Sequence, residues 1–408
     1  MTITPAVGLI GVHGYGAVHL KELGLLSSTG RARLVACADV RAPSGEQAEA
    51  IGSSGTRYFE DWRRMLEPAP AGAGPLDVVV VASPPHMHQE MALAAMEAGA
   101  HVLLEKPPTV TRRDFDQLVG AGARAGLKCQ VGFQSTASGA LGRARQIVAT
   151  EELGGPVGLG AVGTWQRDRG YWTRSEWAGR ATIGGQVVRD GALSNPFAHA
   201  SMNCLVAAGV ADGTAEVVGI EVERYRANQI EVEDTGCVRV SLGGGGAFVV
   251  AVTLCADVVG APALRIMGPS GRASWPYERD TLSVEARGRS WSESFARRSL
   301  TEELVDLVGG RSTQLSCPLE RCGAFVDLVE AVHAAPVYEV PARWVRHVGS
   351  GLGERPVITG VEEAVEEAVS KGRLFSELGA AWAVGARSEV AATGHATGYA
   401  AGHAAGQP

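Results

Sequence analysis

The sequence predicts two domains, an α/β domain on a parallel sheet followed by an α+β domain with a large, open and mainly antiparallel sheet. With 408 residues, the chain is longer than one hydrophobic core comfortably supports. Short β-branched runs alternate with stretches of helical periodicity up to Phe133, whereas strands separated by turns dominate after it. We therefore expect an N-terminal domain at 1–134, a second domain at 135–384, and a disordered tail of small residues at 385–408.

The first domain repeats a strand-then-helix pattern. Its β-branched runs predict strands at 6–12, 32–40, 76–83, 101–107 and 127–133. The spacing of apolar residues between them predicts helices at 16–28, 42–51, 86–98 and 111–125. The valine run from Asp77 to Ala82 is the strongest strand, because it is apolar enough to be buried on both faces.

The second domain mixes strands with fewer helices. Alternating and β-branched runs predict strands at 157–165, 215–226, 235–242, 246–254 and 262–268. Helical spacing predicts helices at 141–150, 195–209, 300–308, 319–335 and 359–379. This order of elements is typical of an α+β domain.

The composition argues against several classes of protein. The net charge is -7 and acidic and basic residues are mixed, so no basic stripe is available to neutralise the phosphates of nucleic acid. Seven scattered cysteines, mostly in apolar runs, indicate buried free thiols and a reducing cytoplasm. The N-terminus lacks the features of a signal peptide, and the stretch from Gly243 to Ala256 is too short to span a bilayer. We expect neither secretion nor membrane insertion.

A glycine-rich loop, VGLIGVHGYG at 7–16, joins the first strand to the first helix. In this setting backbone amides and a helix N-terminus can face a pyrophosphate, which predicts a Rossmann dinucleotide site. His13 stands where the G-x-G-x-x-G pattern has its second glycine. Taken alone, the loop fits a simple turn with positive φ equally well. We assign to the cofactor the loop residues Gly11, His13, Gly14, Tyr15 and Gly16.

Asp39 at the end of the second strand strengthens this prediction. It lies a little over twenty residues after Gly16, where an acid can accept hydrogen bonds from the ribose hydroxyls of an adenosine. A carboxylate there favours NAD because it would repel a 2′-phosphate. Arg41 could offset that repulsion, so NADP stays open.

The strand that ends at Ala82 leads into SPPHMH, at the edge where open α/β sheets bind ligands. We expect Ser83 and Pro84 to face the nicotinamide, and His88 either to start a helix or to contact the cofactor ribose. His86 and His88 are badly spaced for one metal ion and no acids or cysteines cluster near them, so we predict no metal site.

The string AMEAGAHVLLEKP at 95–107, taken with the loop, CADV and SPPHMH, resembles the glucose-fructose oxidoreductase and inositol dehydrogenase family, Gfo/Idh/MocA. The resemblance extends to about Ser376 and implies a Rossmann domain joined to an α+β domain. It also implies that Lys106 lies beside the nicotinamide and the reacting carbon, and that Glu105 contacts the cofactor. The chemistry agrees, because a cationic amine can stabilise the oxyanion character that develops as hydride leaves.

The same resemblance predicts an acid/base group in the second domain: a glycine pair, an aspartate, and a histidine four residues later that leads into a helix. The sequence fits this pattern in two registers. Counted forward from Gly184 and Gly185, Asp190 takes the place of the aspartate and Ser194 stands where the histidine is expected. A serine cannot accept a hydroxyl proton unaided.

Counted back from Gly209, His199 takes the place of the histidine and Asn195 that of the aspartate. We prefer this register because an imidazole can accept a hydroxyl proton near neutral pH. Asn195 also suits a helix N-cap, and Asp190 is a candidate to replace the missing carboxylate. A buried histidine with a structural role remains the alternative for His199.

Aromatic residues and arginines alternate between 164 and 180. Aromatic faces stack on sugars and arginines bind hydroxyls or carboxylates, which favours a sugar or polyol substrate. We assign to this substrate Trp165, Arg167, Tyr171, Trp172, Asp190 and Asn195. Tryptophans in such a loop can equally anchor it or lie at a subunit interface. The family resemblance implies a homo-oligomer, with an apolar sheet face supplied by VRVSL and VVAVTL.

These observations predict an NAD(P)-dependent dehydrogenase that transfers hydride between its cofactor and a secondary alcohol of a sugar, sugar derivative or cyclitol. Lys106 would polarise the alcohol oxygen and His199 would take its proton. Two alternatives remain open: a glycosidase or eliminase that oxidises its substrate transiently with bound NAD, and a redox-silent protein that senses a ligand.

Overall fold

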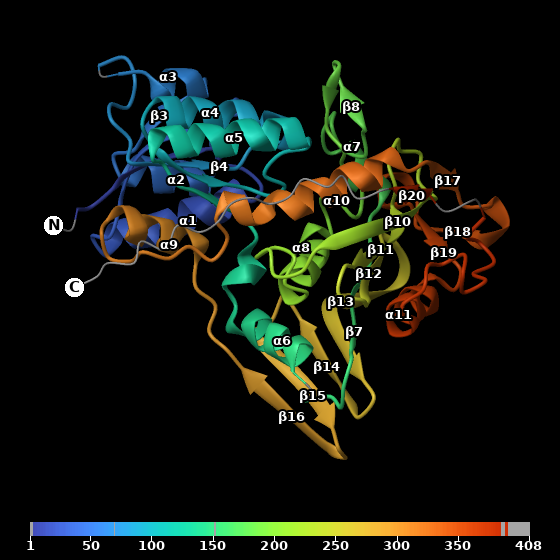
Figure 1. The fold of residues 1–408 in the computed structure, drawn as a ribbon. Helices are drawn as coiled ribbons and strands as arrows, with labels where there is room; N and C mark the ends of the chain where they lie inside the picture. The colour runs from blue at the N-terminus through green and yellow to red at the C-terminus, as the bar shows by residue number, and fades with distance from the viewer. Residues whose placement is uncertain (1–2, 69, 151, 385–387, 391–408) are drawn as a thin grey trace, which may run out of the picture.

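The computed structural model describes residues 3–68, 70–150, 152–384 and 388–390. Within these ranges the chain builds two sheets flanked by helices (Figure 1). The N-terminal sheet is parallel and the second sheet is mixed but mostly antiparallel, so the predicted fold class is confirmed.

The N-terminal sheet has six strands in the order β3-β2-β1-β4-β5-β6. Their bounds are β1 (Ala6–Ile10), β2 (Arg33–Ala38), β3 (Arg57–Phe59), β4 (Val78–Val81), β5 (His101–Leu104) and β6 (Cys129–Val131). The helices are α1 (Gly16–Ser28), α2 (Glu46–Ser53), α3 (Trp62–Leu66), α4 (His88–Glu97) and α5 (Arg112–Ala125). All four residues of β4 are buried, as its valine run predicts.

The strand order reverses between β1 and β4, which pair in parallel at the centre of the sheet. At such a switch point the loops after neighbouring strands diverge and leave a crevice at the carboxyl ends of the strands. The glycine loop after β1 and SPPHMH after β4 lie at this crevice. β3 and α3 were not predicted from the sequence, because three-residue and five-residue elements carry too little periodicity.

The second sheet runs in the order β16-β15-β14-β13-β7-β12-β11-β10-β17, and β20 also pairs with β10. The strands are β7 (Gly158–Gln166), β10 (Val217–Arg226), β11 (Thr235–Leu242), β12 (Ala247–Thr253), β13 (Cys255–Gly268), β14 (Gly271–Pro276), β15 (Thr281–Ala286), β16 (Arg289–Ser294), β17 (Val337–Glu339) and β20 (Ser388–Val390). Two small two-stranded sheets pair β8 (Thr182–Ile183) with β9 (Gln186–Val187) and β18 (Val345–Val348) with β19 (Arg355–Ile358). Only the pairs β7 with β12 and β10 with β17 are parallel within this large sheet.

Helices cover this sheet on both faces. α6 (Gly139–Ala149) and α8 (Ala198–Ala207) pack on one face, and α10 (Gly323–Ala334) runs between β10 and α5 (Figure 1). α11 (Val361–Lys371) packs on β7, β12 and β13 from the other face. Short helices complete the set: α7 (Arg169–Thr173) and the 3-10 turns η1 (Pro85–Met87), η2 (Gln134–Ala137), η3 (Leu319–Cys322), η4 (Ala342–Trp344) and η5 (Gly351–Gly353).

The position of α11 corrects one expectation about self-association. Val365, Ala368 and Val369 join a buried cluster with Val249 and Ala251 of β12. The apolar sheet face that the sequence offered for contact with another subunit is therefore covered by the chain itself.

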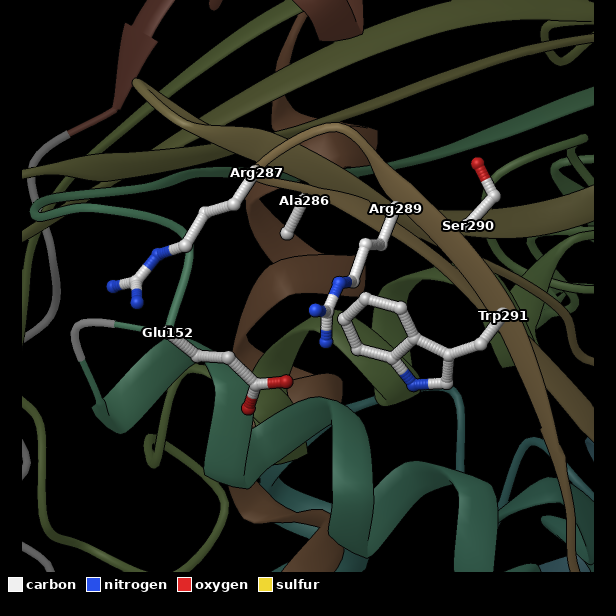
Figure 2. Close-up of a pocket in the computed structure, with 6 residues that line it drawn as sticks. All are labelled: Glu152, Ala286, Arg287, Arg289, Ser290 and Trp291. Atoms are coloured by element: carbon white, nitrogen blue, oxygen red, sulfur yellow. The ribbon is translucent and has the colours of Figure 1, made fainter.

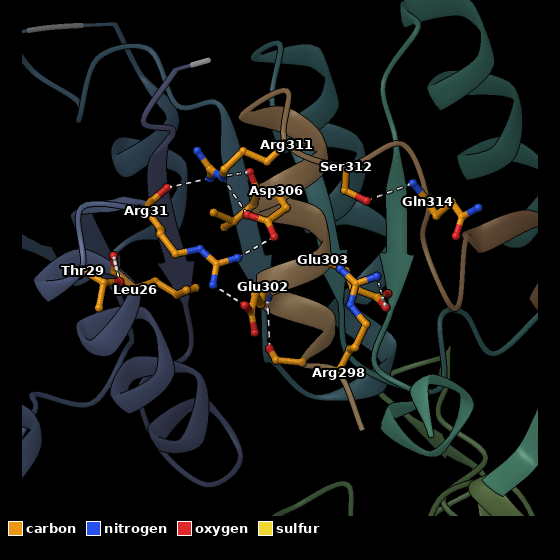
Figure 3. Close-up of polar contacts among 12 residues, drawn as sticks. Leu26, Thr29, Arg31, Arg298, Glu302, Glu303, Asp306, Arg311, Ser312 and Gln314 are labelled. Carbon is orange, nitrogen blue, oxygen red and sulfur yellow. Dashed lines mark hydrogen bonds and ion pairs between the residues drawn. The ribbon is translucent and has the colours of Figure 1, made fainter. Parts of the chain in front are cut away.

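α9 (Leu300–Val308) packs on the N-terminal sheet, although its sequence position suggested the second domain. Leu300, Leu304 and Val305 share a buried cluster with residues of β1, β2 and α1. Polar contacts reinforce the packing, since Arg31 lies between Glu302 and Asp306 (Figure 3). The N-terminal sheet is thus covered by a helix that begins 169 residues after the last strand of the sheet, Leu300 against Val131.

All seven cysteines are buried and unpaired, as predicted. No helix in the described ranges is both long enough and apolar enough to cross a bilayer. Most of the predicted tail, residues 385–387 and 391–408, lies outside the described residues. Within it, 388–390 form β20 and add to the sheet rather than extending freely.

Candidate active site

A cavity of about 980 Å³ opens at the carboxyl ends of the N-terminal strands. It is lined on one side by the loops after β1, β2, β4 and β5, and on the other by second-domain residues at 174–177, Ile183, Asn195 and His199. The two regions that the sequence assigned to cofactor and to acid/base chemistry therefore face the same space.

The glycine loop is shaped by close backbone packing. Gly11 has a φ of +87°, and a Cβ on it would stand 2.3 Å from the carbonyl oxygen of Ala82. A Cβ on Gly16 would stand 2.1 Å from the carbonyl oxygen of Gly11. Gly16 does not line the cavity, so its requirement for glycine comes from the packing of the loop. Gly14, with a φ of +56°, is exposed at the cavity.

His13 occupies its position without backbone strain. Among the described residues, only Arg189 and Arg287 are non-glycine residues with positive φ, so His13 does not need the freedom of a glycine. Its Nε2 lies 3.3 Å from the carbonyl oxygen of Arg41. The imidazole therefore leans toward the end of β2, where the adenosine ribose is expected, and lines the cavity there.

Asp39 ties the end of β2 to the glycine loop. One carboxylate oxygen accepts a hydrogen bond from the amide of Val12 at 2.9 Å, and the other accepts one from the amide of Arg41 at 2.9 Å. Asp39 is half-buried and lines the cavity, so its remaining lone pairs are open to a ligand.

Glu105 lines the cavity and is held by a histidine that sequence reasoning missed. His19 of α1 contacts Oε1 of Glu105 at 2.9 Å, and Gln134 donates to the same oxygen at 3.2 Å. Burial alone would raise the pKa of Glu105, but the hydrogen bond from His19 and the charge of Lys106 lower it overall. Burial and the nearby Glu105 raise the pKa of Tyr15, which lines the cavity, to about 12. Glu105 therefore stays ionised and Tyr15 stays protonated.

The loop after β4 confirms only part of what its sequence suggested. Ser83 and Pro84 line the cavity, but His88 does not. His88 is fully buried, with Nδ1 2.6 Å from the carbonyl oxygen of Pro107 and Nε2 2.9 Å from that of Ser83. His88 is the first residue of α4, which confirms the predicted helix start, and it holds the two loops together instead of contacting the cofactor. His86 faces the cavity instead, because the 3-10 turn η1 comes between β4 and α4.

Lys106 is anchored across the cavity by Asn195. Its ammonium donates to the side-chain oxygen of Asn195 at 2.6 Å and to its backbone carbonyl at 3.1 Å. The side-chain nitrogen of Asn195 in turn donates to Oδ1 of the buried Asp190 at 2.6 Å. Burial lowers the pKa of Lys106 and raises that of Asp190, and the attraction between unlike charges opposes both shifts. An ammonium has three donors, so one remains for a ligand.

His199 of α8 also lines the cavity, but it is oriented by other residues. Its Nδ1 lies 3.1 Å from Oγ of Ser135. Neither Asn195 nor Asp190 is hydrogen-bonded to the ring of His199. The carboxylate of Asp190, which the sequence suggested for orienting His199, instead accepts a hydrogen bond from Asn195, and Asn195 in turn accepts one from Lys106. Burial, reinforced by the charge of Lys106, lowers the pKa of His199 to about 3. The imidazole is therefore neutral at any working pH.

These contacts also distinguish the two registers. Asn195 and His199 line the cavity, whereas the buried Ser194 is bonded to Nε2 of the half-buried His333 at 2.7 Å. Asn195 is not the N-cap of α8, because Phe197 holds that position. The geometry thus gives Asn195 a partner in Lys106 where the sequence allowed a purely structural role.

The aromatic and arginine residues chosen from the sequence do not line the cavity, which is a correction. Trp165 packs on Phe197 with ring centroids 4.4 Å apart, and Arg167 stacks against Trp165 and Tyr171. Trp172 is buried. The next turn of the same segment reaches the cavity, through Arg174, Ser175, Glu176 and Trp177.

A second hollow, also of about 980 Å³, lies beside the hairpin of β15 and β16 and shares no residue with the first. Arg287, Arg289 and Trp291 border it opposite Glu152 of the segment after α6 (Figure 2). No group of three or more metal-ligating side chains is found among the described residues.

The residues at the first cavity fit a dinucleotide. The glycine loop leaves no room for a side chain at Gly11, and the backbone from His13 to Tyr15 borders the cavity at the start of α1. Asp39 stands at the end of β2 with its carboxylate toward the same space. Gly11, His13, Gly14 and Asp39 are thus the residues that would hold the adenosine and pyrophosphate.

Comparisons with known proteins agree with this geometry. A model of the oxidoreductase family with an NAD-binding Rossmann fold matches residues 6–133. Inositol 2-dehydrogenase 2 of Saccharopolyspora erythraea is 32% identical over 170 residues, which are 41% of this chain and 47% of that protein. scyllo-Inositol 2-dehydrogenase (NAD(+)) of Bacillus subtilis is 27% identical over 150 residues, 36% of this chain and 41% of that protein. The chain spans about half the length of the curated relatives it matches.

Solved structures extend the likeness to the second domain as a fold. The WlbA dehydrogenase from Bordetella pertussis, in complex with NADH and UDP-GlcNAcA, superposes with a TM-score of 0.64 at 20% identity, covering 81% of this chain and 96% of that one. UDP-N-acetylglucosamine 3-dehydrogenase GnnA from Acidithiobacillus ferrooxidans gives a TM-score of 0.61 at 21% identity, covering 81% and 99%.

Proposed function

Because residues 6–133 match the model of the oxidoreductase family with an NAD-binding Rossmann fold, we propose that the protein is an NAD-dependent dehydrogenase acting on a secondary alcohol of a sugar, sugar derivative or cyclitol. The observation that carries the proposal is that Lys106 and His199 line the same cavity as the glycine loop. One group can bind an alcohol oxygen and the other can accept its proton.

Lys106 binds the alcohol oxygen with the donor that Asn195 leaves free. As negative charge develops on that oxygen, the ammonium stabilises it. The hydroxyl proton passes to the neutral imidazole of His199, although burial lowers the pKa of the ring to about 3 and so makes it a weaker base than an exposed histidine. Bound NAD supplies the acceptor for the hydride that leaves the same carbon, so the alcohol becomes a ketone.

The second-domain wall of the cavity suits a polar ring. Trp177 offers an aromatic face and Arg174 a guanidinium, which is stacked on the ring of Tyr171 at 3.6 Å. Such pairs bind the C-H faces and hydroxyls of carbohydrates. The relatives named above act on inositols and the structural neighbours include dehydrogenases of UDP-sugars, which supports the same substrate class.

The test is a titration with NAD followed by a panel of sugars, sugar acids and cyclitols, read by the absorbance of NADH. We expect saturable binding of NAD and substrate-dependent formation of NADH. A product formed without net NADH would indicate transient oxidation, as in a glycosidase or eliminase. Full turnover in the Lys106→Ala, His199→Ala double variant would refute the mechanism.

A further inference from the structure

A hydrogen-bond chain behind His199 lies outside the cavity and has no role in the mechanism above. Ser135 belongs to η2, at the junction of the two domains, while His199 and Asn203 lie one turn apart on α8. Oγ of Ser135 lies 3.1 Å from Nδ1 of His199 and donates to Oδ1 of Asn203 at 2.8 Å. Ser135 and Asn203 are both buried.

The number of hydrogens shared among Ser135, Asn203 and His199 decides which ring nitrogen of His199 carries no hydrogen. A serine hydroxyl has one hydrogen, and Ser135 donates it to Oδ1 of Asn203. Toward His199, Ser135 can then act only as an acceptor, so the hydrogen of the neutral ring must lie on Nδ1. Nε2 is left with its lone pair.

The geometry points to Ser135 and Asn203 as positioning residues that hold His199 in the Nδ1-H tautomer and so present Nε2 to the substrate as a proton acceptor. This inference rests on the proposed function for its catalytic meaning. The tautomer itself is a property of the protein without ligands.

The opposite side of the ring is suited to that role. Nε2 has no hydrogen-bond partner within the described part of the chain, and it is not among the buried atoms that are shut off from solvent. His199 lines the cavity, so Nε2 is reachable from it. The ring is also held in place, edge-on to Phe133 at 5.5 Å and stacked with Tyr277 at 6.4 Å.

The charged groups that act on His199 come from two segments, the loop after β5 and the segment between β16 and α9. Lys106 and Arg297 disfavour a second proton on the ring, and Glu105 favours it. Because burial is the largest effect and leaves the ring neutral, the position of its single hydrogen matters more than its ionisation. A neutral ring with the hydrogen on Nε2 would be a donor and could not accept the alcohol proton.

The competing arrangement differs only in the amide of Asn203. Half a turn of that amide would let its nitrogen donate to Ser135, Ser135 would donate to Nδ1, and Nε2 would carry the hydrogen. The side-chain nitrogen of Asn203 has no partner in its present orientation. The two arrangements therefore make opposite predictions for one measurable quantity, the protonated nitrogen of His199.

The experiment uses the full chain with histidines labelled at the ring nitrogens, and assigns His199 by its loss in His199→Gln. We expect nitrogen chemical shifts of an Nδ1-H ring in the unliganded protein. In Asn203→Leu, the hydroxyl of Ser135 is released to donate to Nδ1, and the shifts should change to those of an Nε2-H ring. Ser201→Ala is the matched control, because Ser201 is buried on the same helix with an unpartnered hydroxyl.

With an active substrate, Asn203→Leu should lower kcat by about 10- to 100-fold, which is at most the lower limit of the roughly 100- to 10,000-fold that general-base catalysis supplies, while KM changes little. Asn203→Asp keeps an acceptor for Ser135 and should keep the Nδ1-H ring. An Nε2-H ring in the unmodified protein, or an Nδ1-H ring that persists in Asn203→Leu, overturns the inference. Normal turnover in His199→Gln with an Nδ1-H ring in the unmodified protein would instead refute the proposed function and leave the positioning intact.

Discussion

Replacement of Asn195 by alanine tests whether this residue works in catalysis or only at the start of a helix. The change removes the 2.6 Å bond from Lys106 to the side-chain oxygen and the 2.6 Å bond from the side-chain nitrogen to Asp190. Lys106 keeps only the backbone carbonyl at 3.1 Å. A hydrogen bond to a charged group contributes about 1.5–3 kcal/mol. If that loss falls on the transition state, kcat should drop by about 10- to 150-fold.

The assay is steady-state kinetics with an active substrate, together with urea unfolding of the same variant. Ser194→Ala is the control, because it removes a buried hydrogen bond to His333 from the adjacent residue without touching the cavity. We expect Ser194→Ala to lower the free energy of unfolding and leave kcat unchanged. A loss of stability in Asn195→Ala with kcat within about threefold of normal would refute the reasoning, since threefold is less than 1 kcal/mol.

Three further results are expected. His199 has a pKa of about 3 in the folded protein and an ordinary pKa of 6.5, so the unfolded chain binds more protons between these two pH values. The free energy of unfolding should therefore fall as the pH drops from 6.5 to 3. Urea unfolding should show a smaller fall over this pH range in His199→Gln, and an equal fall in both proteins would contradict the lowered pKa. Asp39→Ala should weaken NAD binding by about 10- to 100-fold and reduce the ratio of NAD affinity to NADP affinity, because the variant lacks the carboxylate that would bond the ribose and repel a 2′-phosphate. An affinity for NAD equal to that of the unmodified protein in a fluorescence titration would show that Asp39 does not bind the cofactor. His88→Ala should destabilise the protein by about 1–3 kcal/mol, because the carbonyl that accepts the single N–H of the ring loses its hydrogen bond. Unfolding midpoints equal to those of the unmodified protein would show that water replaces the ring.

Periodicity and spacing predicted most of the scaffold. The helices at 16–28 and 300–308 were predicted with their exact bounds, and the loop, Asp39 and Lys106 were placed correctly at one cavity. These predictions are correct because the residues within a strand, a turn and a helix determine the local geometry of that segment without help from distant parts of the chain. β3 and α3 were missed because their few residues leave no period to detect.

The partners within the site could not be predicted in the same way. Asn195 meets Lys106, and Ser135 meets His199, only because the two domains fold against each other. The sequence suggested His88 at the cavity, but His86 lines it, because the 3-10 turn η1 changes which side chain faces the cavity. Asn203 alone left a visible signal, since it lies four residues after His199 on a helix, where two side chains share a face.

The return of α9 to the N-terminal sheet has a consequence for how this protein is made. A fragment that ends at residue 134 would expose the surface that Leu300, Leu304 and Val305 cover, and would leave Gln130 without Glu303. During synthesis the nucleotide domain therefore cannot complete its core when its own residues emerge, and must wait until the ribosome has passed residue 308.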